Sequence, residues 1–203
     1  MQLTTIPPNG PAVLLSLAHL KSGGVVCYPT DTLYGIGGDA QNIDAVKKIF
    51  DIKGGGKGRP FSVLFADWET ALEYVKIEID VGEELKKITP GPYTFLFPAK
   101  KPLPAAPGEL LGCRVPDNRF CLELAKKFKK PIISTSANLH RGRPPASIEE
   151  VDVKVSGKVD LVIDGGICKY GEGSTIIDVG NRKILRKGAG LEKAREWLEK
   201  LDV

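Results

Sequence analysis

The chain has 203 residues, enough for one domain with a well-buried core. With 42% hydrophobic and 27% charged residues its composition is that of a globular protein, and its net charge of +4 suits anionic ligands such as nucleotides or RNA without establishing them. No apolar stretch approaches membrane-spanning length, and the N-terminal MQLTTIPPNG lacks the basic start and apolar run of a signal peptide.

Helices are predicted in chain order at 11–21, 42–50, 67–75, 82–88, 119–130 and 191–201. The N-terminal caps of three of them are assigned to Asn42, Asp67, and either Asp117 or Asn118. Strands are predicted at 25–28, 61–65, 93–99, 112–116, 131–135, 160–164, 174–179 and 183–188. Helices and strands alternate early and strands cluster late, which indicates a single α/β domain over residues 1–203, built on one mixed sheet.

The cysteines show no metal or redox spacing. The four cysteines are Cys27, Cys113, Cys121 and Cys168. None belongs to a C-x-x-C pair, and three of them lie in apolar runs and are interpreted as small core residues. This usage favours a reducing, cytoplasmic setting.

A glycine- and lysine-rich stretch, IKGGGKGRPFSVLF at 52–65, raises the possibility of a phosphate-binding loop. It is not a Walker loop, because Gly58 rather than Ser or Thr follows Lys57 and because the order is helix, loop, strand instead of strand, loop, helix. The stretch still offers Lys53, Lys57 and Arg59 on a flexible backbone. The alternative is a glycine-ended helix followed by a solvated basic turn.

Polar side chains follow several predicted strands, where ligands commonly bind in α/β sheets. YPTDTLYGIGG (28–38) follows a strand and offers Thr30, Asp31 and Thr32 beside a glycine-rich turn. TPGPYTF (89–95) places a hydroxyl after a rigid turn, and CRVPDN (113–118) puts Arg114 in an apolar strand. PIISTSAN (131–138) ends a buried strand with hydroxyls and an amide. Taken singly, the threonines could be turn residues and Arg114 could pair with a buried carboxylate.

Together these segments supply small hydroxyls, an asparagine and several cations. That inventory suits a polyanion plus a small polar molecule and does not suit a nucleophile triad, since His19 and His140 have no evident Ser or Asp partner. Two histidines so placed also do not indicate a zinc site.

The ordered motifs resemble the YrdC-like family, the threonylcarbamoyl-AMP synthases, in its short single-domain form. The resemblance covers about residues 10–190 and rests on YPTDTLYGIGG, IFDIKG, TPGPYTF, CRVPDN, STSAN, DLVIDGG, STIIDVG and ILRKGAG. It implies an α/β fold with a twisted mixed sheet flanked by helices and an open basic cavity.

The resemblance also implies an activity. Such an enzyme is a nucleotidyltransferase that makes L-threonylcarbamoyladenylate from ATP, L-threonine and bicarbonate and releases pyrophosphate, with Mg²⁺ accompanying ATP. The product is used to modify an adenosine next to the tRNA anticodon. Expected partners are therefore the tRNA threonylcarbamoyl-transfer machinery, with a possible contact to tRNA or double-stranded RNA and none to a membrane.

The same resemblance assigns site residues, leaving metal ligands unspecified. The threonine side would be formed by Thr32, Arg114 and Ser174. The ATP side would be formed by Lys53, Arg59, Thr94, Ser136, Asn138 and Arg186, of which Lys53 and Arg59 would be catalytic through their charge on the phosphates.

Two departures from the family pattern fall on the nucleotide side. Gly55 stands where the arginine of the usual K-x-R is expected, so Arg59 is a candidate replacement. The SANLHRGRPP turn is one residue longer than usual and contains His140 and Arg141. These departures keep two alternatives open: a divergent member that binds nucleotide or RNA or hydrolyses the adenylate, and a plain RNA-binding module.

Overall fold

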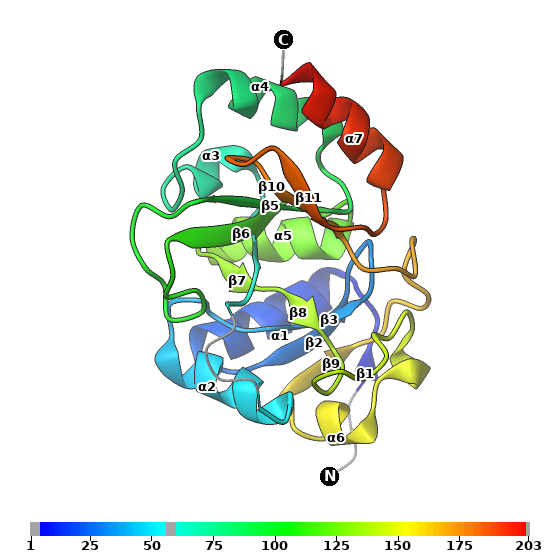
Figure 1. Ribbon diagram of the computed structural model, residues 1–203. Helices are drawn as coiled ribbons and strands as arrows, with labels where there is room; N and C mark the ends of the chain where they lie inside the picture. Colours follow the sequence, from blue (N-terminus) through cyan, green and yellow to red (C-terminus); the bar gives the residue numbers. More distant parts are fainter. Residues whose placement is uncertain (1–4, 56–59, 202–203) are drawn as a thin grey trace.

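The computed structural model describes residues 5–55 and 60–201, and its strands form two mixed sheets (Figure 1). The first sheet has five strands, in the spatial order β1 (Thr5–Ile6), β9 (Leu161–Ile163), β2 (Val26–Pro29), β3 (Tyr34–Gly37) and β8 (Thr135–Ser136). β1, β9 and β2 are parallel to one another, whereas β3 is antiparallel to both of its neighbours.

The second sheet has six strands, in the order β11 (Lys183–Arg186), β10 (Thr175–Asp178), β5 (Tyr93–Pro98), β6 (Leu110–Arg114), β4 (Val63–Leu64) and β7 (Ile132–Ile133). Parallel and antiparallel pairs alternate across it. The mixed α/β class predicted from the sequence is confirmed.

The strands divide between two sheets where the sequence pattern predicts one. The segment predicted as a strand at 131–135 is the crossing point: β7 pairs with β4 of the second sheet, and β8 pairs with β3 of the first. Ser134 lies between them, and its N–H donates to the carbonyl oxygen of Ser62, 2.8 Å away. A second difference is β3, which occupies the stretch interpreted as a glycine-rich turn. Gly35 and Gly37 tolerate strand geometry there because β2 pairs along all four residues.

The six predicted helices are present with shifts at their ends, but the one predicted at 67–75 is only four residues long, and a further helix at 153–156 was not predicted. The helices are α1 (Gly10–Lys21), α2 (Ile43–Ile52), α3 (Trp68–Ala71), α4 (Ile79–Ile88), α5 (Arg119–Phe128), α6 (Val153–Ser156) and α7 (Leu191–Lys200), with a 3₁₀ turn at Ile148–Glu150. Asn42 and Asp67 cap α2 and α3 as predicted, and Asn118 rather than Asp117 caps α5. Within the described part of the chain, no helix is long and apolar enough to span a membrane.

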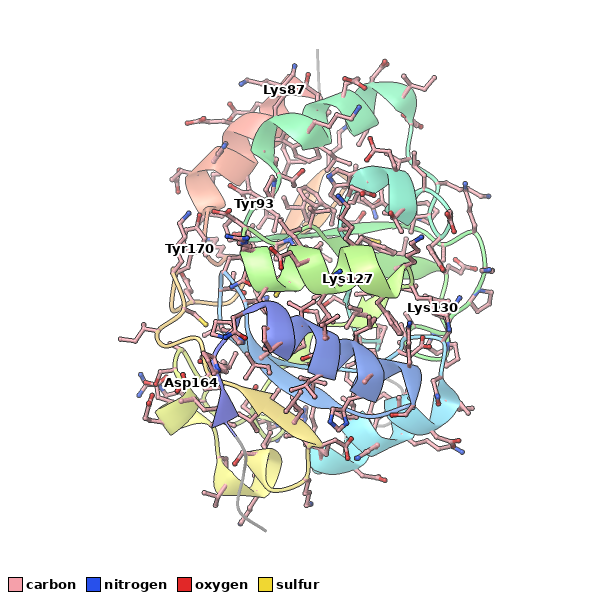
Figure 2. All side chains as sticks on the ribbon, turned by 180° about the vertical axis from the view of Figure 1, so that it is seen from behind. Lys87, Tyr93, Lys127, Lys130, Asp164 and Tyr170 are labelled. Atoms are coloured by element: carbon pink, nitrogen blue, oxygen red, sulfur yellow. The ribbon has the colours of Figure 1, made fainter. Side chains whose placement is uncertain are left out.

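The helices leave one side of the molecule open between the sheets. α4 and α7 cover the outer face of the second sheet, and α2 and α6 lie beyond the first sheet at the opposite end (Figure 1). α1 and α5 pack against each other and close the space between the sheets from behind, as the view from the rear shows (Figure 2). The polar segments of the sequence gather on the other, uncovered side.

Strand alternation separates the core from this open side. On β5, Tyr93, Phe95 and Phe97 point toward the helices, and the ring of Phe95 lies 5.2 Å from that of Trp197. Thr94 and Leu96 point the opposite way, into a cavity. One strand therefore builds both the aromatic core and a wall of the candidate site.

Candidate active site

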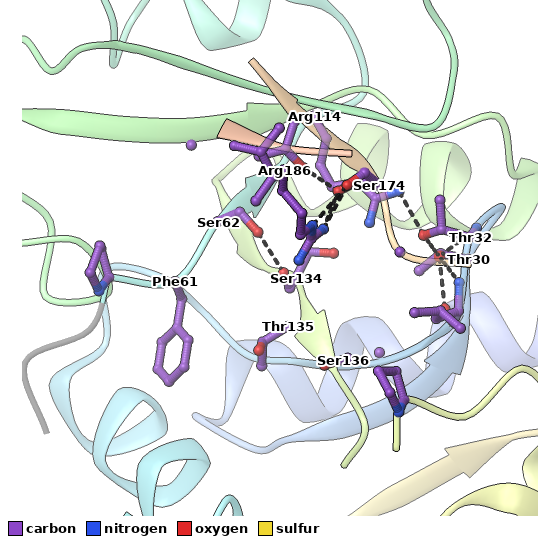
Figure 3. Close-up of a pocket in the computed structure, with 18 of the residues that line it drawn as sticks. Thr30, Thr32, Phe61, Ser62, Arg114, Ser134, Thr135, Ser136, Ser174 and Arg186 are labelled. Atoms are coloured by element: carbon purple, nitrogen blue, oxygen red, sulfur yellow. Dashed lines mark hydrogen bonds between the residues drawn. The ribbon is translucent and has the colours of Figure 1, made fainter. Parts of the chain in front are cut away.

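A cavity of about 550 Å³ opens between the two sheets. It is walled by the β2–β3 turn, the segment before β4, the β7–β8 crossing and strands β5, β6, β10 and β11 (Figure 3). Its polar lining consists of hydroxyls and two cations: Thr30, Thr32, Ser62, Thr94, Ser134, Thr135, Ser136, Ser174, Arg114 and Arg186. No Asp or Glu lines the cavity among the residues described, so these surroundings favour an anionic ligand.

The β2–β3 turn is shaped by its own threonine. The Thr30 hydroxyl accepts hydrogen bonds from the N–H groups of Thr32 and Leu33, at 3.1 and 3.2 Å, and donates to the Leu33 carbonyl oxygen. Its oxygen also lies 3.0 Å from the hydroxyl oxygen of Thr32. Thr30 thus behaves as a turn residue, and the turn places the Thr32 hydroxyl in the cavity wall.

Arg114, on β6, makes a buried ion pair at the end of the cavity next to this turn. Its Nη2 donates to Asp31 Oδ1 at 2.8 Å and to Thr32 Oγ1 at 3.1 Å. The side chains of Arg114 and Asp31 are 8% and 0% exposed. Burial raises the pKa of Asp31, and the neighbouring Arg114 opposes that shift. The sequence-based alternative of a buried pair for Arg114 is confirmed, yet Arg114 also lines the cavity.

Arg186, on β11, is the second cation of the cavity. Its Nε and Nη2 donate to the carbonyl oxygen of Ser174 at 3.0 and 2.8 Å, and Nη2 also donates to the Ser174 hydroxyl at 2.9 Å. That hydroxyl lies 2.8 Å from the hydroxyl of Thr94. Although Arg186 is partly exposed, burial and then the positive charge of Arg114 lower its pKa. Because both guanidinium groups line the same cavity, an anion bound there would meet two positive charges.

Lys53 and Asn138 lie beside the cavity rather than in its lining. Lys53 donates to the carbonyl oxygens of Ser136 and Asn138, and burial lowers its pKa to about 8. The Asn138 amide donates to the carbonyl oxygens of Leu139 and Gly142, both at 2.8 Å, and its Oδ1 accepts from the Ser136 hydroxyl. Lys53 and Asn138 thus shape the Ser136 side of the cavity from behind.

The loop after α2 begins with two glycines in conformations that suit glycine. Gly54 and Gly55 have φ angles of +75° and +119°, values that side-chain-bearing residues rarely adopt. The position of the K-x-R arginine is therefore held by a residue whose backbone conformation favours glycine. Arg59 lies outside the described residues. The described chain resumes at Pro60, which lines the cavity.

Beside that loop, the longer turn is tied to α2. The N–H of His140 donates to the carbonyl oxygen of Lys53 at 2.9 Å, and Arg141 has a φ of +65°. The extra residue of SANLHRGRPP is thus accommodated by a left-handed conformation, outside the described lining of the cavity.

The sequence alone did not identify the apolar part of the lining, which includes Phe61, Leu96, Leu110 and Leu185. Strand alternation could have found Leu96, because it shares a face with Thr94. Leu110 and Leu185 are 40% and 51% exposed, which no local pattern indicates. Such walls suit a flat ring or a methyl group of a ligand.

A metal site built from protein ligands does not fit the described residues. Among them, no group of three or more His, Cys, Asp or Glu side chains could hold a metal ion. The hydroxyls and guanidinium groups of the cavity are also poor ligands for Mg²⁺, which prefers carboxylate and phosphate oxygens.

A family comparison decides what kind of protein this is. The family model Sua5/YciO/YrdC, described as telomere recombination, matches residues 18–188. The chain belongs to the Sua5/YciO/YrdC family. The resemblance inferred from the motifs is thereby confirmed, and six of the assigned residues meet in one cavity of this family member: Thr32, Thr94, Arg114, Ser136, Ser174 and Arg186.

Relatives in this family carry names that describe one activity. A Methanocaldococcus jannaschii protein with the provisional name threonylcarbamoyl-AMP synthase is 35% identical over 168 residues, which cover 82% of this chain and 80% of the relative. The Homo sapiens threonylcarbamoyl-AMP synthase is 32% identical over 202 residues, covering 93% of this chain and 71% of the relative.

Among solved structures, the crystal structure of P. abyssi Sua5 complexed with L-threonine superposes with a TM-score of 0.87. The two are 27% identical, and the match covers 97% of this chain and 61% of the P. abyssi chain. This family member therefore spans less than two thirds of the P. abyssi protein.

Proposed function

We propose that this protein is a threonylcarbamoyl-AMP synthase, a nucleotidyltransferase that forms L-threonylcarbamoyladenylate from ATP, L-threonine and bicarbonate and releases pyrophosphate. The names of the relatives and the bound L-threonine of the similar P. abyssi structure support this assignment. The product would then serve the threonylcarbamoylation of tRNA by separate transfer machinery.

The observation that carries the proposal is the charge pattern of the cavity. Arg114 and Arg186 reach into it among hydroxyls, with no acidic side chain in the described lining. In the proposed reaction the carbamate of threonine, an anion, attacks the α-phosphorus of ATP, another anion. Catalysis then requires neutralisation of charge and alignment of the two reactants, which guanidinium groups and fixed hydroxyls supply.

The proposed reaction needs no nucleophile from the protein, and no cysteine thiol or histidine base is among the described lining residues. The four cysteines are buried, and burial raises the pKa of Cys27 to about 12 and also raises that of Cys113 and Cys121. Neither His19 nor His140 is among the described lining residues.

We assign the threonine side to Thr32, Arg114 and Ser174, with the Arg114 guanidinium facing the substrate carboxylate. Thr94, Ser136 and Arg186 would contact the nucleotide. Lys53 and Asn138 would act next to them, and Arg59 would face the phosphates. Mg²⁺ would enter with ATP as part of the substrate, bound through phosphate oxygens.

A specific observation favours one alternative, in which the protein hydrolyses the adenylate. Gly55 occupies the position of the K-x-R arginine and has a glycine-favouring φ of +119°, so this chain lacks that guanidinium at that place. A member without it could bind the nucleotide but hydrolyse the adenylate instead of making it.

The test measures pyrophosphate release by the purified protein with ATP and Mg²⁺. Release that requires L-threonine and bicarbonate together, with the adenylate identified by mass, is the expected result. No release under these conditions would refute the proposal. Breakdown of added threonylcarbamoyl-AMP without its synthesis would favour the alternative.

A further inference from the structure

A buried acid that does not reach the cavity holds one of its two arginines. The Asp31 side chain is fully buried, and Asp31 is not among the described lining residues, whereas its ion-pair partner Arg114 is. We propose that Asp31 is a positioning residue, which orients the Arg114 guanidinium for the carboxylate of the amino acid substrate. This inference rests on the proposed function.

The nitrogens of the Arg114 guanidinium differ in their hydrogen bonds within the protein. Nη2 donates both of its hydrogens, to Asp31 at 2.8 Å and to Thr32 at 3.1 Å. Nη1 donates to no group of the described residues, and Nε is buried without a partner there. Because Arg114 lines the cavity and Nε is buried, Nη1 is the guanidinium nitrogen available to a ligand anion.

Asp31 is itself fixed from two other segments. Its second carboxylate oxygen accepts the N–H of Asp117 at 3.1 Å, just before α5. Its backbone carbonyl oxygen accepts the N–H of Tyr170 at 3.0 Å, in the loop that leads to β10. A carboxylate held in this way cannot follow a moving guanidinium, so it fixes the orientation of Arg114 before the substrate arrives.

A purely electrostatic role for Asp31 makes the opposite prediction. If the carboxylate mainly cancelled the charge of Arg114, its removal would free that charge and strengthen the binding of a substrate carboxylate. If it positions the side chain, removal leaves a long side chain with several rotatable bonds, and binding weakens. The sign of the change therefore separates the two roles.

The experiment measures the Kd of L-threonine and of ATP by calorimetry, which does not depend on turnover. Asp31→Asn should weaken L-threonine binding about tenfold or more and change the Kd of ATP by less than about threefold. In an Arg114→Ala background, Asp31→Asn should change L-threonine binding by less than about twofold, because its effect passes through the missing arginine.

Asp39→Asn is the matched control. Asp39, like Asp31, is an aspartate in an ion pair: it lies 3.1 Å from Lys130, and its side chain is 9% exposed. Neither Asp39 nor Lys130 is among the described lining residues. Asp39→Asn should lower the melting temperature without altering L-threonine binding. The inference is overturned if Asp31→Asn tightens the binding of L-threonine or leaves it unchanged, or if it weakens the binding of L-threonine and ATP equally. It is also overturned if Asp31→Asn further weakens L-threonine binding in the Arg114→Ala background.

A measurement on the wild-type protein covers the case in which Asp31→Asn does not fold. The NMR signals of the Arg114 guanidinium, assigned by their loss in Arg114→Lys, should show resolved Nη resonances because Asp31 and Thr32 hinder rotation of the group. A single averaged resonance would overturn the inference. Wild-type pyrophosphate release is scored separately, so that a protein that binds L-threonine but makes no adenylate refutes only the proposed function.

Discussion

The ammonium group of Lys53 donates a hydrogen bond to the carbonyl oxygen of Ser136, 2.7 Å away and 83 residues later in the chain. A second bond, of 3.0 Å, goes to the carbonyl oxygen of Asn138. The lysine assigned to the phosphates therefore also joins the end of α2 to the loop that carries the nucleotide-side residues. Its effect on stability can be separated from its effect on catalysis by pH.

Lys53→Met should change the pH dependence of stability. Burial lowers the pKa of Lys53 from 10.5 to about 8, so between those values the folded protein loses a proton that the unfolded chain keeps. The cost of burying the charge is fully present below the folded pKa and is relieved as the pH rises. The free energy of unfolding should thus rise in the wild type relative to Lys53→Met, by on the order of 2 kcal/mol between about pH 7 and about pH 10.

Chemical denaturation at several pH values measures this difference. Lys47→Met is the control, because Lys47 lies on α2, the helix that Lys53 follows, with a side chain that is 68% exposed. Its stability should follow the pH dependence of the wild type. If the difference between wild type and Lys53→Met stays flat across the range, Lys53 is not titrating as its burial predicts.

Arg186→Ala should lower kcat/KM by about 30- to 1,000-fold, the loss expected from removing roughly 2–4 kcal/mol of transition-state stabilisation. Arg186→Lys should also be impaired, because one ammonium group cannot reproduce the contacts of Nε and Nη2 with Ser174. Steady-state pyrophosphate release provides the measurement, with Arg195→Ala on α7 as an exposed control. A loss below about tenfold would mean that Arg186 only supports the wall.

Gly112→Ala should fill the floor of the cavity. A Cβ at Gly112 would lie 3.3 Å from Leu96 Cδ2, from Ser62 Cβ and from Thr94 Cγ2, so three neighbours must move. We expect a stability loss of about 1–3 kcal/mol and weaker ligand binding. Gly108→Ala is the control, since a Cβ there meets nothing within 4 Å. Equal melting temperatures and equal ligand affinities for the two variants would contradict this expectation.

Arg59→Ala tests whether Arg59 supplies the guanidinium absent at Gly55. If it does, the loss should be on the order of 2–4 kcal/mol in transition-state stabilisation, and Arg59→Lys should be impaired as well. Lys57→Ala, two residues earlier in the same loop, shows the effect of losing an ordinary loop charge. Similar small losses of activity in both variants would mean that Arg59 acts only as a surface charge.

Much of the site could be predicted because many of its residues belong to short sequence motifs. Thr32, Arg114 and Ser174 were assigned through the resemblance of their motifs to the family, and they line one cavity although 142 residues separate the first from the last. Asp31 was noticed only as a polar neighbour of Thr32. Its partnership with Arg114 joins positions 83 residues apart, which no local pattern reveals.

Two parts of the fold differ from what the sequence pattern predicts. The stretch around Gly35 and Gly37 was interpreted as a glycine-rich turn, but pairing with β2 makes it a strand although glycine disfavours strands. The division into two sheets depends on Ser134, where the chain leaves one set of neighbours for another. Which strands pair depends on the tertiary structure, so hydrophobic periodicity alone cannot predict the pairing.

The sequence by itself determined the α/β class, the caps of α2 and α3, the family and the set of side chains available for binding an anion. These properties follow from local propensity and from residue types at fixed spacings, both of which can be read along the chain. Only the tertiary structure decided which of those side chains face a common cavity and which act from behind it. Lys53 and Asn138 hold a loop, Asp31 holds Arg114, and Arg186 rests on Ser174, because each contact depends on strands and loops brought together across many residues of chain.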